Sequence, residues 1–206
     1  MTPVYKLSAN SVKNGRTVYG SMLAGNTAFE LPGDFQSIAT VSVGSGGAAN
    51  VEFTSIPTTG YSHLEVRFIA RTNRADTIDD MFVQVGNGSV DTGSNYAAHR
   101  LYGTGASVGA GSAINKTQME WYNQFTANNS PASTFGCGSF QILDYANANK
   151  YKTGRILGGS DQNGEGYVEY HSGLWRSTSA ITNIKITANG SFRQYSHFAL
   201  YGIKSA

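Results

Sequence analysis

The 206-residue sequence has one cysteine, four prolines, few charges and no long apolar run. Because Cys137 is alone, no intrachain disulfide can form, and the fold must be held by its own core. Charged residues make up only 14%, the formal net charge is +2, and the basic residues form no run, which argues against nucleic-acid binding. No apolar run approaches membrane-spanning length, and the first residues lack the apolar region of a signal peptide. We expect a protein without membrane insertion.

Glycine, tyrosine and phenylalanine are plentiful, with 25, 12 and 10 residues. These residues suit short strands joined by tight turns better than helices. Residues 62–75 form the clearest strand, because apolar and charged residues alternate with the period of two that is typical of a half-buried strand. Its apolar side is predicted to hold Leu64, Val66, Phe68 and Ala70, and its outer side Glu65, Arg67 and Arg71.

Similar strand patterns recur along residues 35–206, at spacings typical of all-β proteins and with no internal boundary. We predict about eleven strands in a two-sheet antiparallel β-sandwich. Residues 103–113 are mostly glycine, serine and alanine, and are predicted to be a surface loop because they offer too few apolar side chains to pack. The predicted core comprises Leu64, Val66, Phe68, Phe140, Ile142, Ile184, Ile186, Phe198 and Leu200.

Residues 1–34 differ from the rest because their apolar residues keep neither the helix nor the strand period. Val18, Met22 and Phe29 are examples, scattered among glycines and Pro32. Two interpretations remain open. The segment adds a strand or two to the sandwich, or it is an extended arm whose apolar residues bind another chain. We favour an attachment arm, because a single sheet cannot bury such a pattern in one register.

The sequence contains none of the common catalytic, metal-binding or cofactor motifs. The four histidines, His63, His99, His171 and His197, are dispersed, and we predict no catalytic residues, metal or cofactor. A glycosidase needs a pair of carboxylates, and four acidic residues close in sequence are candidates for one: Asp144, Asp161, Glu165 and Glu169. Residues 160–166 alternate Asp161, Asn163 and Glu165, as in a calcium loop, but a polar hairpin turn is the preferred interpretation.

Ligand binding is predicted at aromatic residues with polar or glycine-rich neighbours, because sugars bind flat rings flanked by amides and hydroxyls. The candidates are Tyr102, Trp121, Tyr122 and Trp175. Each tryptophan has a competing assignment, since a tryptophan in a strand-rich sequence often lies in the core.

Several sequence blocks, in order, carry a resemblance to a known kind of module. They are FTSIP (53–57), HLEVRFIARTNRA (63–75), NYAAHRLYG (95–103), ILDYANANKYKT (142–153), SGLWRSTSAITNIKIT (172–187) and FALYGIK (198–204). Together they resemble a β module of virion structural proteins of tailed phages, notably phages of cyanobacteria and other marine bacteria. The resemblance implies a jelly-roll-like sandwich, a place on the virion and no catalysis. It supplies no binding residues, and this chain lacks the shaft repeats of a long fibre.

The sequence therefore predicts a non-enzymatic phage virion surface protein. It is either a capsid decoration or short head fibre, or the tip of a tail fibre, with a host surface glycan as its candidate ligand. Residues 1–34 are expected to contact other virion proteins. A homotrimer is expected, because phage fibres and decoration proteins of sandwich type commonly resemble threefold assemblies, and closed symmetry protects sheet edges. The alternative is a carbohydrate-active sandwich enzyme, a depolymerase.

Overall fold

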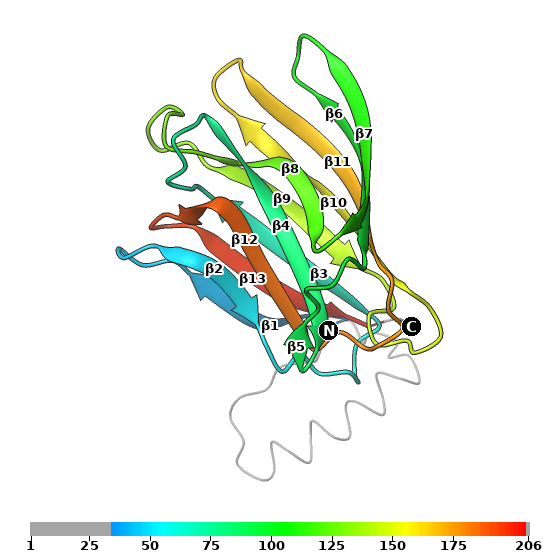
Figure 1. Ribbon diagram of the computed structural model, residues 1–206. Coiled ribbons are helices and arrows are strands. Elements are labelled where there is room, and N and C mark those ends of the chain that lie inside the picture. The colour runs from blue at the N-terminus through cyan, green and yellow to red at the C-terminus, as the bar shows by residue number, and fades with distance from the viewer. Residues whose placement is uncertain (1–33, 205–206) are drawn as a thin grey trace, which may run out of the picture. The chain divides into compact units, whose positions relative to one another are not determined.

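The computed structural model describes residues 34–204, and in this range it contains strands and no helix (Figure 1). The predicted arm, residues 1–34, lies outside the described residues except for Asp34. The strands of the described range are β1 Phe35–Ser42, β2 Ala48–Phe53, β3 His63–Ala70, β4 Ile78–Asn87, β5 Ser89–Val90, β6 Tyr96–Gly103, β7 Val108–Lys116, β8 Met119–Thr126, β9 Gly136–Ile142, β10 Lys152–Asp161, β11 Gly166–Trp175, β12 Asn183–Phe192 and β13 His197–Ile203.

These strands form two antiparallel sheets. The first has eight strands in the order β1-β13-β3-β9-β10-β11-β6-β7. The second has the order β2-β12-β4-β5, and β8 also pairs with β4. Buried apolar side chains from both sheets form one core between them. The all-β sandwich predicted from the sequence is confirmed.

The chain winds between the sheets as in a jelly roll. Strands β1, β3, β9 and β13 belong to the first sheet, and β2, β4, β8 and β12, each a neighbour of these in chain order, belong to the second. Strand β13 lies between β1 and β3, and β12 lies between β2 and β4, which is the jelly-roll arrangement. Two inserted hairpins, β6–β7 and β10–β11, widen the first sheet beyond β9.

The core confirms the predicted inward positions, since all nine predicted core residues are buried. Its centre is a cluster of phenylalanine rings from both sheets. The Phe68 and Phe125 ring centroids are 5.5 Å apart, and those of Phe192 and Phe198 are 4.9 Å apart, both in edge-to-face geometry. Aromatic pairs in this arrangement stabilise a core beyond the burial of their area.

Strand β8 lies very close to the first sheet, and two glycines make this approach possible. A Cβ atom on Gly136 would lie 2.3 Å from the carbonyl oxygen of Gln124. A Cβ atom on Gly173 would lie 2.6 Å from Sδ of Met119. Both distances are shorter than van der Waals contact, so larger residues would push β8 away from β9 and β11.

Part of the predicted loop 103–113 is a strand, so that prediction was wrong from Val108 onward. Residues 108–113 belong to β7, the last strand of the first sheet. The small residues of β7 allow larger side chains of β6 to pack on it. A Cβ atom on Gly109 would lie only 2.4 Å from the Tyr102 ring. The strand therefore packs on β6 through small residues, while its large apolar residues, Val108 and Ile114, are exposed.

Arg71 is also placed differently from the prediction, which put it on the outer side of its strand. It follows the end of β3 and is only 6% exposed. Its guanidinium donates hydrogen bonds to the carbonyl oxygens of Pro131 (2.7 Å) and Ser130 (2.9 Å). The alternation of β3 ends at Ala70, and Arg71 instead holds the loop between β8 and β9.

Candidate functional site

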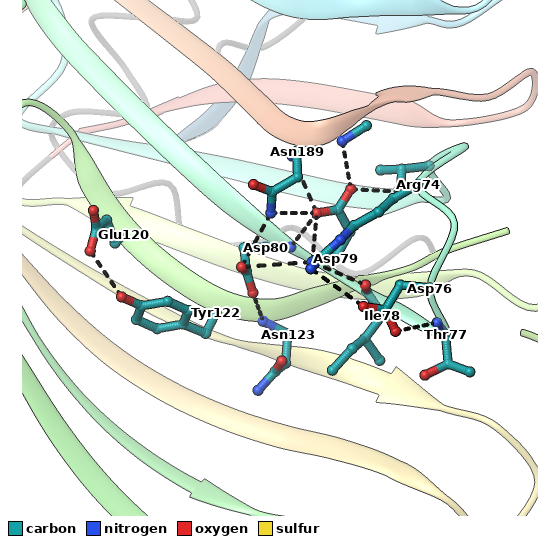
Figure 2. Close-up of polar contacts among 12 residues, drawn as sticks. Arg74, Asp76, Thr77, Ile78, Asp79, Asp80, Glu120, Tyr122, Asn123 and Asn189 are labelled. Carbon is teal, nitrogen blue, oxygen red and sulfur yellow. Dashed lines mark hydrogen bonds and ion pairs between the residues drawn. The ribbon is translucent and has the colours of Figure 1, made fainter. Parts of the chain in front are cut away.

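The candidate site includes an irregularity in strand β8. Where β4 has one residue, Asp80, the paired strand β8 has three, residues 122–124. Asn123 has a φ of 54°, and its backbone N–H donates to Oδ1 of Asp80 at 3.0 Å. Bulges of this kind redirect side chains and are common next to functional sites. Figure 2 shows Tyr122 and Asn123 beside Asp80.

The bulge forms one wall of a cleft of about 670 Å³. The loop between β3 and β4 and the turns of both inserted hairpins complete it. We call it the turn cleft. Its lining includes the side chains of Arg74, Asp80, Tyr122, Asn123, Glu165 and Tyr167.

A buried carboxylate, Asp79, lies next to the cleft residue Asp80 and holds the neighbouring backbone in place (Figure 2). Its Oδ2 accepts hydrogen bonds from Oγ1 of Thr72 (2.8 Å) and the backbone N–H of Gly190 (2.9 Å). Its Oδ1 accepts one from Nδ2 of Asn189 at 2.9 Å, and Nη1 of Arg74 lies 3.4 Å away. Asp79 thus ties the end of β12 to the loop between β3 and β4.

The neighbouring carboxylate, Asp80, faces the cleft but has both oxygens occupied. In addition to the contact with Asn123, its Oδ2 accepts a hydrogen bond from Nδ2 of Asn189 at 3.2 Å. Burial raises the pKa of Asp80 above its ordinary value, and the charge of Asp79 acts in the same direction, while the hydrogen bond from Asn123 opposes the shift.

Three tyrosine rings lie in this region. Tyr122 and Tyr167 line the turn cleft, and Tyr102 lies beside Tyr167. The Tyr122 hydroxyl donates to Oε2 of Glu120 at 2.9 Å. Burial together with this contact raises the pKa of Tyr122 to about 12, so its hydroxyl stays protonated at neutral pH. The Arg100 guanidinium lies 4.8 Å from the Tyr122 centroid and 4.2 Å from the Tyr102 centroid. The Tyr102 and Tyr167 centroids are 6.3 Å apart. Cation–π contacts therefore hold two of the rings in place.

Behind these rings, Glu169 and His171 are buried, with exposures of 0% and 1%. Oε1 of Glu169 accepts a hydrogen bond from Nδ2 of Asn123 at 2.5 Å and lies 3.9 Å from Nη2 of Arg100. Nε2 of His171 is 2.9 Å from Oε2 of Glu169, but the approach is out of line for a hydrogen bond. Both ring nitrogens of His171 and Oε2 of Glu169 therefore lack a hydrogen-bond partner.

A smaller cavity of about 260 Å³ borders His171, between β6, β7 and β8. We call it the His171 pocket; among its lining residues are Ala98, Arg100, Tyr102, Gly111, Tyr122 and His171. Tyr122 lines both this pocket and the turn cleft.

The four predicted ligand-binding residues divide into two groups. Tyr102 lines the His171 pocket, and Tyr122 lines both cavities. Trp121 and Trp175 are buried, with exposures of 0% and 3%, so neither ring offers a face to a ligand. Nε1 of Trp175 donates to Oδ2 of Asp91 at 2.8 Å. The structure gives the two tryptophans a packing role.

The four acidic candidates for a glycosidase pair are not brought together as a group. Asp144 follows β9 and Asp161 ends β10, so the ten-residue strand β10 separates them, a length of roughly 30 Å. Glu165 lines the turn cleft, while Glu169 is buried. Oδ1 of Asp161 accepts a hydrogen bond from the N–H of Asn163 at 2.9 Å, within the turn between β10 and β11, which confirms the predicted hairpin turn.

Asp80, Asn123, Arg100 and His171 are functional candidates that the sequence did not indicate. The cross-strand register places His171 beside Ile156, which pairs in turn with core residue Phe140. A charged or polar residue at an inward strand position could have indicated these candidates. However, the inward side of β6 and β11 is known only once the pairing of these strands is known.

Comparison with known proteins adds no relative: no family model matches the chain, and none of the curated proteins matches it. Within residues 34–204, no three histidine, cysteine, aspartate or glutamate residues cluster as metal ligands would. The same range contains no helix with the length and apolar character required to cross a membrane.

The outer side of the first sheet carries a second feature, an exposed apolar patch. Leu157, Tyr170 and Leu101 are cross-strand neighbours, exposed by 59%, 47% and 59%. Val168 and Val108 both pair with Gly103 in the next row and are also exposed. We call these five residues the outer patch. Contiguous exposed apolar patches often mark protein interfaces.

Proposed function

We propose that the protein is a non-enzymatic surface protein of a phage virion, which binds a host surface glycan in the turn cleft. The composition of this cleft carries the proposal. The rings of Tyr122 and Tyr167 offer apolar faces to the C–H groups of a sugar, while Arg74, Asn123 and Glu165 offer donors and acceptors to its hydroxyls. The turns that hold these groups project from a rigid sandwich, as binding loops commonly do.

The virion location rests on the resemblance of the sequence blocks to tailed-phage modules. A capsid decoration, a short head fibre and a tail-fibre tip all fit this role. We propose that residues 1–34 attach the protein to other virion proteins, because their scattered apolar residues suit a partner surface better than a sheet. A protein without residues 1–34 that still joined the particle would contradict this attachment.

Tyr122→Ala is expected to weaken glycan binding by the full-length protein about tenfold or more, because the ring is the aromatic face shared by both cavities. Glycan arrays and titration calorimetry with array hits measure the effect. Tyr151→Ala is the matched control, since Tyr151 is 54% exposed and does not line the cleft. A wild-type protein that bound neither glycans nor host cells would exclude the proposed function.

A depolymerase is the second candidate, favoured by the raised pKa of Asp80, which is a property of a general acid, and by Glu165 in the same cleft. Binding remains the better proposal because both Asp80 oxygens already accept hydrogen bonds. Incubation with host polysaccharide separates the two. Reducing ends released by the wild type but not by Glu165→Gln would establish an enzyme.

We also propose that the protein assembles as a homotrimer that buries the outer patch. Its five exposed apolar side chains offer on the order of 500 Å², a large part of the roughly 800 Å² that each partner of a stable interface buries. Around a threefold axis, the Leu101–Tyr170–Leu157 row of one copy can pack against the valine row of the next.

Leu157→Glu is expected to convert the trimer to monomers, because it places a charge at the centre of a buried apolar contact. Light scattering of the full-length protein gives the mass. Ile114→Glu is the matched control, an equally drastic change at a residue that is 69% exposed and lies outside the patch. A wild-type monomer in solution, or a trimer that keeps its mass with Leu157→Glu, contradicts the proposal.

A further inference from the structure

We infer that the glycan site has a second subsite, the His171 pocket, which takes an uncharged sugar unit. This inference rests on the proposed function of the turn cleft and adds to it a minimum ligand length and a charge preference.

The buried polar atoms of His171 and Glu169, which lie as close as 2.9 Å without forming a hydrogen bond, are the first observation. Both ring nitrogens of His171 and Oε2 of Glu169 have no hydrogen-bond partner, although both residues are almost fully buried. Native proteins rarely leave such atoms without a partner, because burying them removes their bonds to water. His171 lines the pocket and Glu169 does not, so a molecule there reaches the imidazole of His171.

The shared wall of the two cavities is the second observation. Tyr122 lines both the turn cleft and the His171 pocket. Its ring is held by Arg100 on one side and by the hydrogen bond to Glu120 at its hydroxyl. A chain of sugar units bound in the cleft can therefore follow this fixed ring from one cavity into the other.

The charges around the pocket are balanced. Arg100 lies 3.9 Å from Glu169, and Lys116 lies 3.1 Å from Glu120. A charged sugar would lose its hydration there without an unpaired counter-charge to meet it, which disfavours uronates and sulfated units. An uncharged hydroxyl both donates to and accepts from imidazole nitrogens, and so gives His171 a hydrogen bond that it lacks.

The volume of the His171 pocket limits the number of sugar units that it can hold. At about 260 Å³ the pocket lies just below the roughly 300–1,000 Å³ of typical ligand sites. It therefore suits one sugar ring rather than several. With one further unit in the turn cleft, the shortest ligand that uses both cavities is a disaccharide.

The experiment is calorimetry on the full-length protein with linear glucose, mannose, galactose and N-acetylglucosamine oligomers of one to four units, and with the matching uronates. Gly111→Leu adds bulk to the pocket and leaves the buried residues His171 and Glu169 unchanged in sequence. A Cβ atom at Gly111 makes only ordinary contacts, the nearest being Cγ of Arg100 at 3.6 Å. Ile114→Phe adds bulk to the same strand outside the pocket and is the control.

For the wild type and Ile114→Phe, we expect affinity to rise about tenfold from one to two neutral units, the gain of one well-made set of contacts. Gly111→Leu should remove this gain and leave monosaccharide binding unchanged. The His171 ring nitrogen resonances should shift with the disaccharide and stay in place with the monosaccharide, a response that a purely structural histidine would not give.

The outcomes separate the two proposals. Monosaccharide binding without a gain on lengthening, or a gain that survives Gly111→Leu, overturns the second subsite and leaves the glycan site intact. Uronates that bind more tightly than neutral oligomers overturn the charge preference. A wild type that binds none of these sugars overturns the proposed function and this inference with it.

Discussion

Trp121→Ala is expected to lower the free energy of unfolding by about 3–5 kcal/mol, as is typical when a large aromatic side chain is removed from a core. The side chain is fully buried, and its ring lies 5.1 Å from that of Phe140. Two glycines, Gly154 and Gly173, face the ring across the core, and Cβ atoms there would lie 3.5 and 3.2 Å from it. No neighbouring side chain can fill the cavity from that side.

Urea denaturation followed by circular dichroism measures this loss. Trp121→Phe should cost less, because it keeps a ring in the same place. Tyr122→Ala is the contrasting neighbour, expected to weaken glycan binding and to change stability little, since Tyr122 is only partly buried. A Trp121→Ala protein of near wild-type stability that had lost glycan binding would give Trp121 the ligand role and refute the packing assignment.

Asp79→Ala is expected to destabilise the protein by a similar amount, about 3–5 kcal/mol, because it breaks a buried, charge-assisted network. The substitution leaves the Thr72 hydroxyl and the Gly190 N–H without this acceptor, and it leaves the Asn189 amide with only its bond to Asp80. It also leaves the partly buried Arg74 without one of its carboxylate partners. Thermal and urea unfolding measure the effect.

Asp80→Asn is the matched control at the adjacent carboxylate, and it should not destabilise the protein at neutral pH. The raised pKa of Asp80 means that the folded state holds this proton more tightly than the unfolded state. Its contribution to stability is therefore fully present below the ordinary aspartate pKa of about 4 and is lost as the pH rises through the raised value. At neutral pH, Asp80→Asn should match or exceed wild-type stability. Equal destabilisation by both substitutions would contradict the assigned roles.

The strand pattern of the sequence predicted the core well but not the edge of the first sheet. Leu64, Val66 and Phe68 alternate with polar residues and are buried as expected. Strand β7 was missed because it packs through glycine and alanine, whose small size leaves no hydrophobic period to detect. The order of strands depends on pairing between distant segments, which local patterns do not encode.

The site was predictable only in part, for a related reason. Tyr122 could be proposed from its polar neighbours, but its orientation comes from a bulge that exists only where β4 and β8 are paired. Asp80 closes that bulge from another strand, so no local signal connects the two. Trp121 and Tyr122 are adjacent in the chain, yet one is core and the other lines a cleft.

The position of β13 has a consequence for the order in which the molecule folds. Phe35 pairs with Ile203, so among residues 34–204 the strand that pairs with β1 comes from the far end of the sandwich sequence. Such long-range pairing is typical of folding in milliseconds to seconds rather than microseconds. During synthesis, β1 and β3 emerge long before β13. Until β13 is made, the edges of β1 and β3 that pair with it are free to associate with other chains. The first sheet is thus completed by β13, the last of the described strands to be made.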